Sequence, residues 1–332
     1  MSCNRILFKK VAKTKYIGTA TKIIAIVLTP FAYFFSYYIL SHYTGGDQIS
    51  YHEFYDALYG ARIEEIMFLA LAHVSSAEPL SAFILWLGSN LGFEKNVYIS
   101  LLNVILIVSL FLLARQHRVR MLMIGLLLTN FYVVMLMTGG ERLKIAYIFL
   151  ILSTLFVGKI RLLFLSLSPF AHLQSILLLA GVMMAHFEGF ILNLLFRFCI
   201  SKRSIGLLIV LLVVGATIGY YLFDGIQNKA TVYASEEVSP FELINLGILS
   251  VIALYVSHKR FRMFLVLLPM IPAIAILGGM RVNMIAVTLV IYYLMEERRL
   301  HHPLVYLLMA YFSIKTIPFL NNIILYGDGF AS

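Results

Sequence analysis

Long apolar runs alternate with short polar segments along almost the whole chain. Many of these runs hold about 18 residues with few or no charges, roughly the length that an α-helix needs to cross the hydrocarbon core of a membrane. Neither the period of a strand nor that of a half-buried soluble helix dominates them. The pattern therefore predicts an all-α polytopic membrane protein.

The runs predict about eleven transmembrane helices, or about thirteen if one ambiguous stretch crosses fully. We expect the eleven at residues 22–41, 97–114, 121–138, 143–158, 162–180, 185–200, 205–223, 241–257, 263–279, 282–295 and 303–322. No soluble domain or linker is visible between them, so residues 1–332 are expected to form a single integral membrane domain.

The ambiguous stretch is 63–93, which is apolar but interrupted by "AHVSSAEP" at 72–79. It must begin and end outside, because the next span runs inward. We favour a hairpin that dips into the membrane over two short spans. Irregular backbone at membrane depth is tolerated only where it lines protein or water, so residues 42–95 are expected to cap a site, with 224–240 as a second outer loop.

The charge distribution predicts the orientation. Most of the 26 Lys and Arg residues, and with them the net charge of +10, lie in every second gap between spans. The basic segments are Arg5 to Lys22, 115–120, 159–161, 197–203, 258–262 and 296–302. Cytoplasmic loops carry such an excess, so the N-terminus is expected inside and the C-terminus outside. Because the orientation in the membrane explains the excess of basic residues, the net charge gives no support for nucleic-acid binding.

Other classes of chemistry lack their signatures. Cys3 and Cys199 both map to the basic side, and no disulfide or metal-type cysteine spacing occurs. Phosphate-binding loop, serine-hydrolase and zinc-protease motifs are absent from the sequence. We expect no cofactor and no metal, although a metal site of outer carboxylates stays open. The first apolar run has no small-residue cleavage site and is expected to be a retained helix.

A few basic residues lie on the predicted outer side, against the charge rule: Arg62, Lys95, Arg142, Lys144, Lys229, Arg281 and Lys315. Two arginines stand out among them. "LMTGGERLKIA" (136–146) and "ILGGMRVNMIA" (276–286) place Arg142 and Arg281 after glycine pairs, where positive φ is available for a tight turn. A guanidinium at a helix start suits bidentate capture of phosphate. The alternative is an arginine that extends to the membrane interface. We favour a binding site, and expect neither side chain to hold the bundle together.

Further candidates are single ionisable or aromatic residues. His172 lies within a predicted span, where an ionisable group indicates function or a hydrogen bond to a neighbouring helix. Asp47 and Glu78 are outer carboxylates that suit a general base, or that cap a turn. Tyr51 and Tyr55 suit stacking on sugar rings, or belong to an interfacial aromatic belt. His186 and Glu188 are expected at an outer turn, solvated.

The order of these features resembles the Wzy/EpsG family of bacterial polysaccharide polymerases. The matching segments are "GGDQISYHEFY" (45–55), Glu78-Pro79, "GGERLKIAYIFLILST" (139–154), "SPFAHLQSILLLA" (168–180) and "GGMRVNM" (278–284). The resemblance spans most of the chain. It implies a fold akin to the multi-span, GT-C-like glycosyltransferases that use lipid-linked sugars.

The resemblance also implies an activity. Such enzymes join oligosaccharide repeat units carried on undecaprenyl diphosphate, at the periplasmic face of the bacterial inner membrane. The family's periplasmic arginines correspond here to Arg142 and Arg281, which we expect to act with His172, Asp47 and Glu78. We expect substrate contacts from Glu141, Lys144, Tyr51, Tyr55 and Asn283. Membrane lipid and a chain-length regulator protein are the other expected partners.

Three other functions compete with polymerisation. A flippase for lipid-linked oligosaccharide predicts mid-membrane charges and an internal repeat, whereas the charges here cluster at the outer ends. A membrane O-acyltransferase needs a catalytic histidine, for which His172 is the candidate. A ligase that moves finished glycan shares the arginine chemistry, so the sequence barely separates it from a polymerase.

Overall fold

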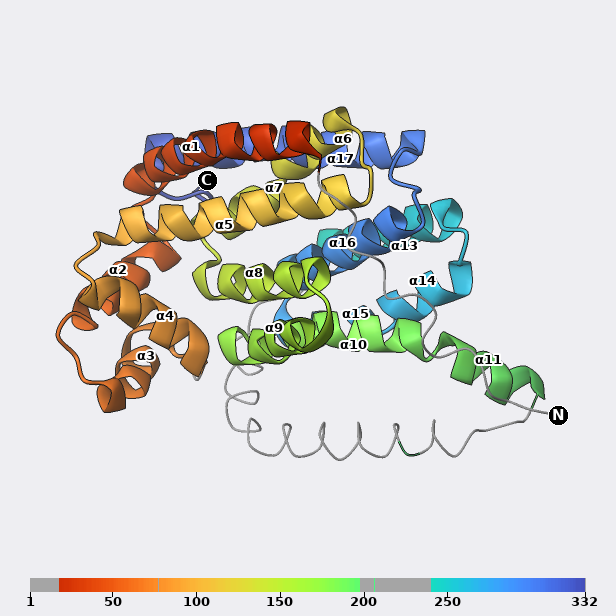
Figure 1. Cartoon of the computed structure of the whole chain (residues 1–332), viewed down its shortest axis with the longest axis horizontal. Coiled ribbons are helices and arrows are strands. Elements are labelled where there is room, and N and C mark those ends of the chain that lie inside the picture. The colour runs from red at the N-terminus through yellow and green to blue at the C-terminus, as the bar shows by residue number, and fades with distance from the viewer. Residues whose placement is uncertain (1–17, 77, 198–205, 207–239, 332) are drawn as a thin grey trace. The chain divides into compact units, whose positions relative to one another are not determined.

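The computed structural model describes residues 18–76, 78–197, 206 and 240–331 (Figure 1). All regular elements in these ranges are helices, which confirms the predicted all-α class. The predicted span 205–223 and outer loop 224–240 lie outside the described residues, apart from 206 and 240, as do Cys3 and Cys199. The chain divides into two compact units. Within the described residues, unit 2 holds 18–176 and 300–331, and unit 1 holds 177–299.

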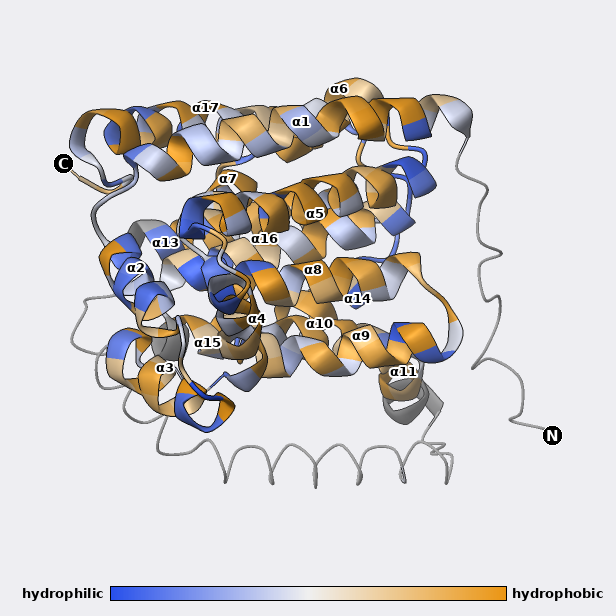
Figure 2. Ribbon diagram, turned by 60° about the vertical axis from the view of Figure 1, so that its left-hand side comes forward, coloured by the Kyte–Doolittle hydropathy of each residue, from blue (hydrophilic) through white to orange (hydrophobic). Residues whose placement is uncertain are grey.

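Three helices of the described residues, all in unit 2, are long and apolar enough to cross a membrane. They are α1 (Thr19–His42), α5 (Lys95–Gln116) and α17 (Pro303–Tyr326). Figure 2 shows them as largely hydrophobic along their length. The exposed face of α1 carries Ile26, Phe31 and Phe34, each at least two-thirds exposed, as expected of a surface that meets lipid. Several apolar helices are thus compatible with a membrane protein.

Two bent helix pairs raise the number of candidate spans to five if each pair is one span. The first pair is α6 (Met121–Leu128) and α7 (Phe131–Thr138), bent by 46°. Asn130 begins the second half, because its side chain accepts a hydrogen bond from the Tyr132 N–H at 2.9 Å. Counted by length and composition alone, the described helices therefore give fewer spans than the eleven to thirteen predicted.

The second bent pair occupies the ambiguous stretch 63–93. A 3-10 turn (η1, Ile63–Glu65) leads into α3 (Ile66–Val74), and α4 (Pro79–Asn90) follows after a bend of 102°. Each helix is too short to cross a bilayer, which takes about 20 residues. The bend lies within the predicted interruption at 72–79, and such a pair is either a broken span or a re-entrant loop.

The remaining helices of unit 2 lie beside the long ones. Helix α8 (Glu141–Leu155) packs against both α5 and α9 (Gly158–Ala171), and α4 packs against α9. Helix α2 (Asp47–Ala57) packs against α3 and α4. The three short helices α2, α3 and α4 gather at one end of α1 and α5, at the left of Figure 1.

Helix termini of unit 2 collect at two opposite ends. At the end that holds α2, the N–H groups of Thr44 and Gly45 donate to the carbonyl of Gly327 at 3.0 and 2.7 Å, which joins the end of α1 to the end of α17. At the other end, Arg115 reaches Thr21 at 3.5 Å, which joins the end of α5 to the start of α1. The predicted outer segments of unit 2 thus share one end and its basic segments share the other.

The predicted span 162–180 is wrong as a continuous helix. Helix α9 ends at Ala171, His172 is its extended C-cap, and α10 (Ser175–His186) starts after a break. Pro169 lacks the N–H that would bond to the carbonyl of Leu165, and the hydroxyl of Ser168 donates to that carbonyl instead, at 3.0 Å. Hydropathy does not register this loss, so the sequence pattern ran through the break.

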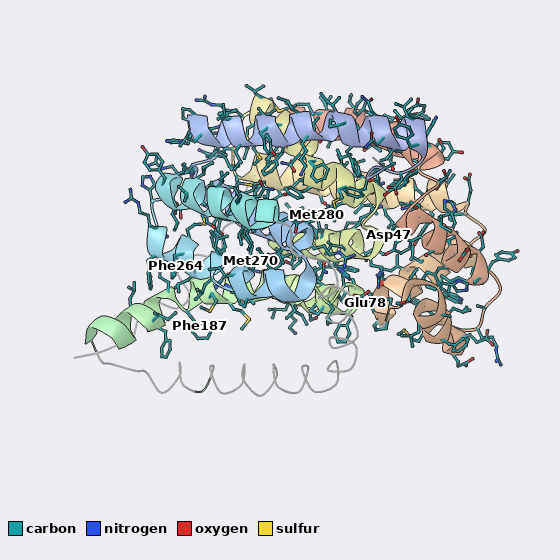
Figure 3. The ribbon with its side chains drawn as sticks, turned by 180° about the vertical axis from the view of Figure 1, so that it is seen from behind. Asp47, Glu78, Phe187, Phe264, Met270 and Met280 are labelled. Atoms are coloured by element: carbon teal, nitrogen blue, oxygen red, sulfur yellow. The ribbon has the colours of Figure 1, made fainter. Side chains whose placement is uncertain are left out.

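Unit 1 contains α10 from Leu177 on, α11 (Glu188–Arg197), α13 (Pro240–Val256), α14 (Arg260–Leu267), α15 (Met270–Leu277) and α16 (Gly279–Glu296). Helix α16 packs against α13, α14 and α15. The predicted span 263–279 is divided between α14 and α15 at Leu268 and Pro269. In Figure 3, Phe264 and Met270 lie on α14 and α15, on either side of this division.

An ion pair in unit 1 contradicts the predicted locations of two residues on opposite sides of the membrane. Arg262 donates to Glu188 at 2.6 Å. Glu188 was predicted at an outer turn and Arg262 in a cytoplasmic loop, so both predictions cannot hold. A break in the helix at 172–174 precedes the predicted turn, and a turn at this break would put Glu188 on the same predicted side as Arg262.

Candidate functional site

Glu78 is the centre of a buried polar cluster at the end of unit 2 that holds α2. It is the N-cap residue of α4, yet its side chain makes no capping hydrogen bond. The carboxylate turns away from the helix and is only 5% exposed. The turn before it contains Ser75 with φ 46, a left-handed conformation that is strained for a non-glycine residue.

Four donors bind this carboxylate. On Oε2, Arg142 Nη1 donates at 2.6 Å and the hydroxyl of Ser76 at 2.7 Å. On Oε1, His172 Nδ1 lies at 2.6 Å and the main-chain N–H of Leu173 donates at 3.1 Å. An ionised carboxylate offers about four lone-pair positions. Glu78 is therefore fully engaged and holds Arg142 and His172 on its two oxygens.

Arg142 is fixed from a second side. It lies in the first turn of α8, and its Nε donates to the hydroxyl of Tyr51 on α2 at 2.9 Å. Burial raises the pKa of Tyr51, and the nearby Arg142 opposes this effect. Tyr51 therefore keeps its proton and can donate it. The guanidinium carries five N–H donors, and these contacts use two of them.

His172 is oriented by the same carboxylate. Its side chain is 10% exposed and faces Glu78 through Nδ1. Because the carboxylate oxygens of an ionised Glu78 can only accept, Nδ1 is the ring nitrogen that donates to it, and Nε2 is the ring nitrogen that can take up a proton when the ring is neutral. A carboxylate that holds a histidine in this tautomer is the arrangement of acid–base dyads. The break between α9 and α10 makes this orientation available.

No protein-family model, curated protein or solved structure matches this chain. The cluster combines a cation that can bind an anion with a histidine that can accept a proton, and one carboxylate positions both.

The structure brings together four sequence candidates: Arg142, Glu78, His172 and Tyr51. Asp47 lies nearby but exposed, as the first residue of α2 and one turn before Tyr51. Asp47 and Glu78 both appear at the end of unit 2 that holds α2 to α4 in Figure 3. Among the described residues no group of three or more His, Cys, Asp or Glu side chains could hold a metal ion.

Two predicted substrate contacts are instead buried in protein contacts. Glu141 pairs with Lys95 at 3.1 Å, and both side chains are at most 3% exposed. Lys144 is fully buried and donates to the carbonyl of Met137 at 3.0 Å. On a helix, side chains one and two positions away from Arg142 point in other directions than Arg142 does. Glu141 and Lys144 were predicted at the Arg142 site because they are close to Arg142 in the sequence, but their side chains face the protein interior.

Tyr55 and Asn283 also bind protein groups. The hydroxyl of Tyr55 donates to the carbonyl of Phe93 at 3.1 Å, and its ring is buried. Asn283 is 3% exposed and donates to the carbonyl of Glu242 at 3.1 Å, which joins α16 to α13. Both contacts hold the fold together.

Arg281 belongs to unit 1 and lies half-buried in the first turn of α16. Gly278 before it has φ 80, as predicted for this turn, and a Cβ on Gly279 would overlap the side chain of Glu242. In the first arginine turn the prediction of positive φ was wrong, because Gly139 and Gly140 have φ of −112 and −100. The two turns are alike in sequence but not in backbone.

The prediction that Arg142 holds nothing together is also corrected. Its loss would leave the buried carboxylate of Glu78 without its strongest partner, which is costly. Sequence reasoning missed Ser76 and Gln48 and treated Lys95 only as a charge on the unexpected side. That sign anomaly was the available signal for Lys95, whereas nothing in the local sequence marks the other two.

Proposed function

We propose that this protein is a polysaccharide polymerase that joins oligosaccharide repeat units carried on undecaprenyl diphosphate. The observation that carries the proposal is the carboxylate of Glu78, which holds Arg142 and His172 on opposite oxygens. One partner suits the leaving diphosphate and the other suits the attacking hydroxyl. Glycosyl transfer from a lipid diphosphate needs both functions in one place.

Arg142 serves the leaving group. When the bond between the anomeric carbon and the diphosphate oxygen breaks, negative charge develops on that oxygen. A guanidinium that is already oriented stabilises this charge without reorganisation. Nε and Nη1 are held by Tyr51 and Glu78, and the remaining donors of the fork bind the phosphate oxygens. Tyr51 contributes its hydroxyl proton as a further donor.

His172 serves the acceptor. Its Nε2 takes the proton of the acceptor hydroxyl while the oxygen of that hydroxyl forms the new bond to the anomeric carbon. Glu78 stays ionised and stabilises the imidazolium through Nδ1. The proton count balances, since the hydroxyl proton moves to His172 and the lipid diphosphate departs as an anion. Asp47 is a second carboxylate at the same end of unit 2.

The membrane arrangement is part of the proposal. We assign the end of unit 2 that holds Glu78 to the periplasmic face of the bacterial inner membrane, with the N-terminus cytoplasmic and the C-terminus periplasmic. The collection of basic residues at the opposite end supports this orientation. About eleven to thirteen spans and a GT-C-like fold complete the proposal. Membrane lipid and a chain-length regulator protein are the further partners that we propose.

Arg281 is proposed as the second phosphate ligand. A diphosphate presents anionic oxygens on two phosphorus atoms, so two guanidinium groups bind it without either having to stretch. The arginine turn of α16 has the backbone N–H groups and the dipole of a helix start. That Arg142 and Arg281 bind one diphosphate, under a cap formed by 42–95, stays a prediction.

Deleting the gene tests the function. Loss of a polymerase leaves single repeat units on the final acceptor, loss of a ligase leaves none, and loss of a flippase removes outer glycan altogether. Loss of an acyltransferase leaves polymer of full length without its acyl groups. We expect single repeat units on a glycan gel, and restoration of the ladder by the native gene but not by Arg142→Ala. Any of the other three patterns would reject polymerisation.

A further inference from the structure

Lys95 is a buried cation with two partners from different helices. It is the first residue of α5, and its side chain is 3% exposed. Its ammonium group lies 3.1 Å from Glu141 Oε1 on α8 and donates to Gln48 Oε1 on α2. Gln48 in turn donates from Nε2 to the carbonyl of Thr138 at 2.5 Å. One lysine thus ties α2, α8 and the end of α7 together.

Stability alone is a poor reason for this pair. Taking two charges out of water costs about as much as their attraction returns, and well-packed apolar residues of similar volume often stabilise a protein as well or better. Glu141 is 1% exposed, and no hydrogen bond reaches either carboxylate oxygen, although Lys95 lies close to one of them. The best-attested role of such buried ionic groups is to fix register.

The register fixed here is the rotation of α8. Glu141 directly precedes Arg142, so their side chains leave the helix about 100° apart. Lys95 holds Glu141 inward, which directs Arg142 toward α2 and α4. Rotation of this turn by one residue would bring Glu141 to the place of Arg142 and set a carboxylate against Glu78.

The same lysine also orients α2. Gln48 and Tyr51 are three residues apart and therefore share a face of α2. Gln48 meets Lys95, and Tyr51 accepts the hydrogen bond from Arg142 at 2.9 Å. The hydrogen bond from Lys95 to Gln48 and the hydrogen bond from Arg142 to Tyr51 thus lie one helical turn apart on α2.

We infer that Lys95, through Glu141 and Gln48, is a positioning residue that fixes the direction of Arg142 for binding the lipid diphosphate. The inference rests on the proposed function, because it assigns Arg142 the diphosphate as its ligand. Neither Lys95 nor Glu141 is expected to touch that ligand, since both are buried.

The test compares Lys95→Met/Glu141→Leu with each single variant and with Arg142→Ala, in purified protein reconstituted into liposomes. Thermal unfolding reports stability, and titration with undecaprenyl diphosphate reports binding. We expect each single variant to be destabilised, because each leaves a buried charge unpaired. We expect the double variant to be less destabilised than either single variant but to bind about tenfold or more weakly, because a small misplacement of a positioned group is costly.

The outcomes separate the inference from the function. Native binding by the double variant, together with lost binding by Arg142→Ala protein that thermal unfolding shows to be folded, overturns the inference and leaves the function standing. Native binding by Arg142→Ala rejects Arg142 as the diphosphate ligand and so contradicts the proposed function itself. If the double variant does not fold, Gln48→Met decides, since it removes only the link to α2. Weakened binding supports the inference, and unchanged binding overturns it.

Discussion

Arg142 donates to Glu78 at 2.6 Å, which joins the start of α8 to the start of α4 across 64 positions of the sequence. The two residues lie in different predicted segments, one an arginine turn and the other an interrupted apolar stretch. Neither residue alone predicts a site with any certainty, whereas together they form a buried ion pair that positions the guanidinium. The direction of the guanidinium is set by the fold before any ligand arrives.

Glu78→Gln is the sharpest test of this pair for stability. The amide cannot balance the charge of Arg142. Its NH₂ group also takes the place of one carboxylate oxygen and so meets hydrogen-bond donors with no acceptor between them. We expect a loss on the order of 2–3 kcal/mol in the free energy of unfolding, as for a buried charged group that loses its partner. Thermal unfolding followed by circular dichroism measures it.

Glu64→Gln is the matched control for that variant. It lies on the same hairpin, and its side chain is 81% exposed beside Arg62. The free energy of unfolding of Glu64→Gln should differ from that of the native protein by no more than about 0.5 kcal/mol. Equal losses in the two variants would show that the Glu78 cluster carries no special share of the stability.

His172→Gln should separate binding from turnover. The glutamine keeps a side-chain N–H for Glu78 but has no basic ring nitrogen. We expect undecaprenyl diphosphate to bind as in the native protein, while glycan elongation slows by about 10²-fold or more, the usual effect of losing a general base. His186→Gln, an exposed position, is the control. Native elongation by His172→Gln would remove His172 from the reaction.

Arg142→Lys tests the planar fork against charge alone. Lysine keeps the positive charge beside Glu78, so the protein should stay folded. A point charge cannot bind Tyr51, Glu78 and a phosphate in the same geometry. We therefore expect polymer length and yield on a glycan gel to fall sharply. A ladder of native length would show that charge suffices and that the fork has no role.

The class of fold could be predicted from the sequence because many apolar runs independently indicate the same class. Each apolar run adds to the same conclusion, and the basic gaps add an orientation. The individual site candidates were visible for a related reason, since Arg142 and Lys95 break the charge rule and His172 lies in an apolar run. A polar residue in such a place is costly, and this cost is readable without a structure.

The pairings were not readable, because they depend on geometry between helices. Glu141 lies next to Arg142 in the chain yet faces Lys95 in the core. Glu78 looked like a cap before Pro79, but its side chain leaves the helix to meet α8 and α9. The break at His172 was missed because Pro169 and Ser168 change backbone hydrogen bonding without changing hydropathy.

Cysteine labelling tests the orientation and the position of the turn in the hairpin that contains His172. In a background in which Cys3 and Cys199 are replaced by serine, Asp47→Cys should react with a membrane-impermeant reagent from outside. Arg118→Cys and Gly189→Cys should not react. Gly189 follows Glu188, so it distinguishes a turn at 172–174 from the later turn that hydropathy predicted. Labelling of Gly189→Cys but not Arg118→Cys would restore the later turn.

A cross-link tests whether the two arginine turns meet. In the same background, the double variant Arg142→Cys/Arg281→Cys should be joined by a short bifunctional thiol reagent if both arginines bind one diphosphate. Arg142→Cys/Arg262→Cys is the control pair, since 258–262 is predicted to lie on the cytoplasmic side. Cross-linking of the control pair only would place Arg281 away from the site and leave Arg142 as the single arginine ligand.

Elongation by the purified protein tests the central claim most directly. The native chain is reconstituted into liposomes with an undecaprenyl-diphosphate-linked repeat unit isolated from a strain that lacks the gene. Glycan length and released undecaprenyl diphosphate are then followed together. The account predicts glycans of two or more repeat units, with one undecaprenyl diphosphate released for each new bond, and neither product with Arg142→Ala. Native protein that releases no undecaprenyl diphosphate and leaves every glycan at one repeat unit would contradict it.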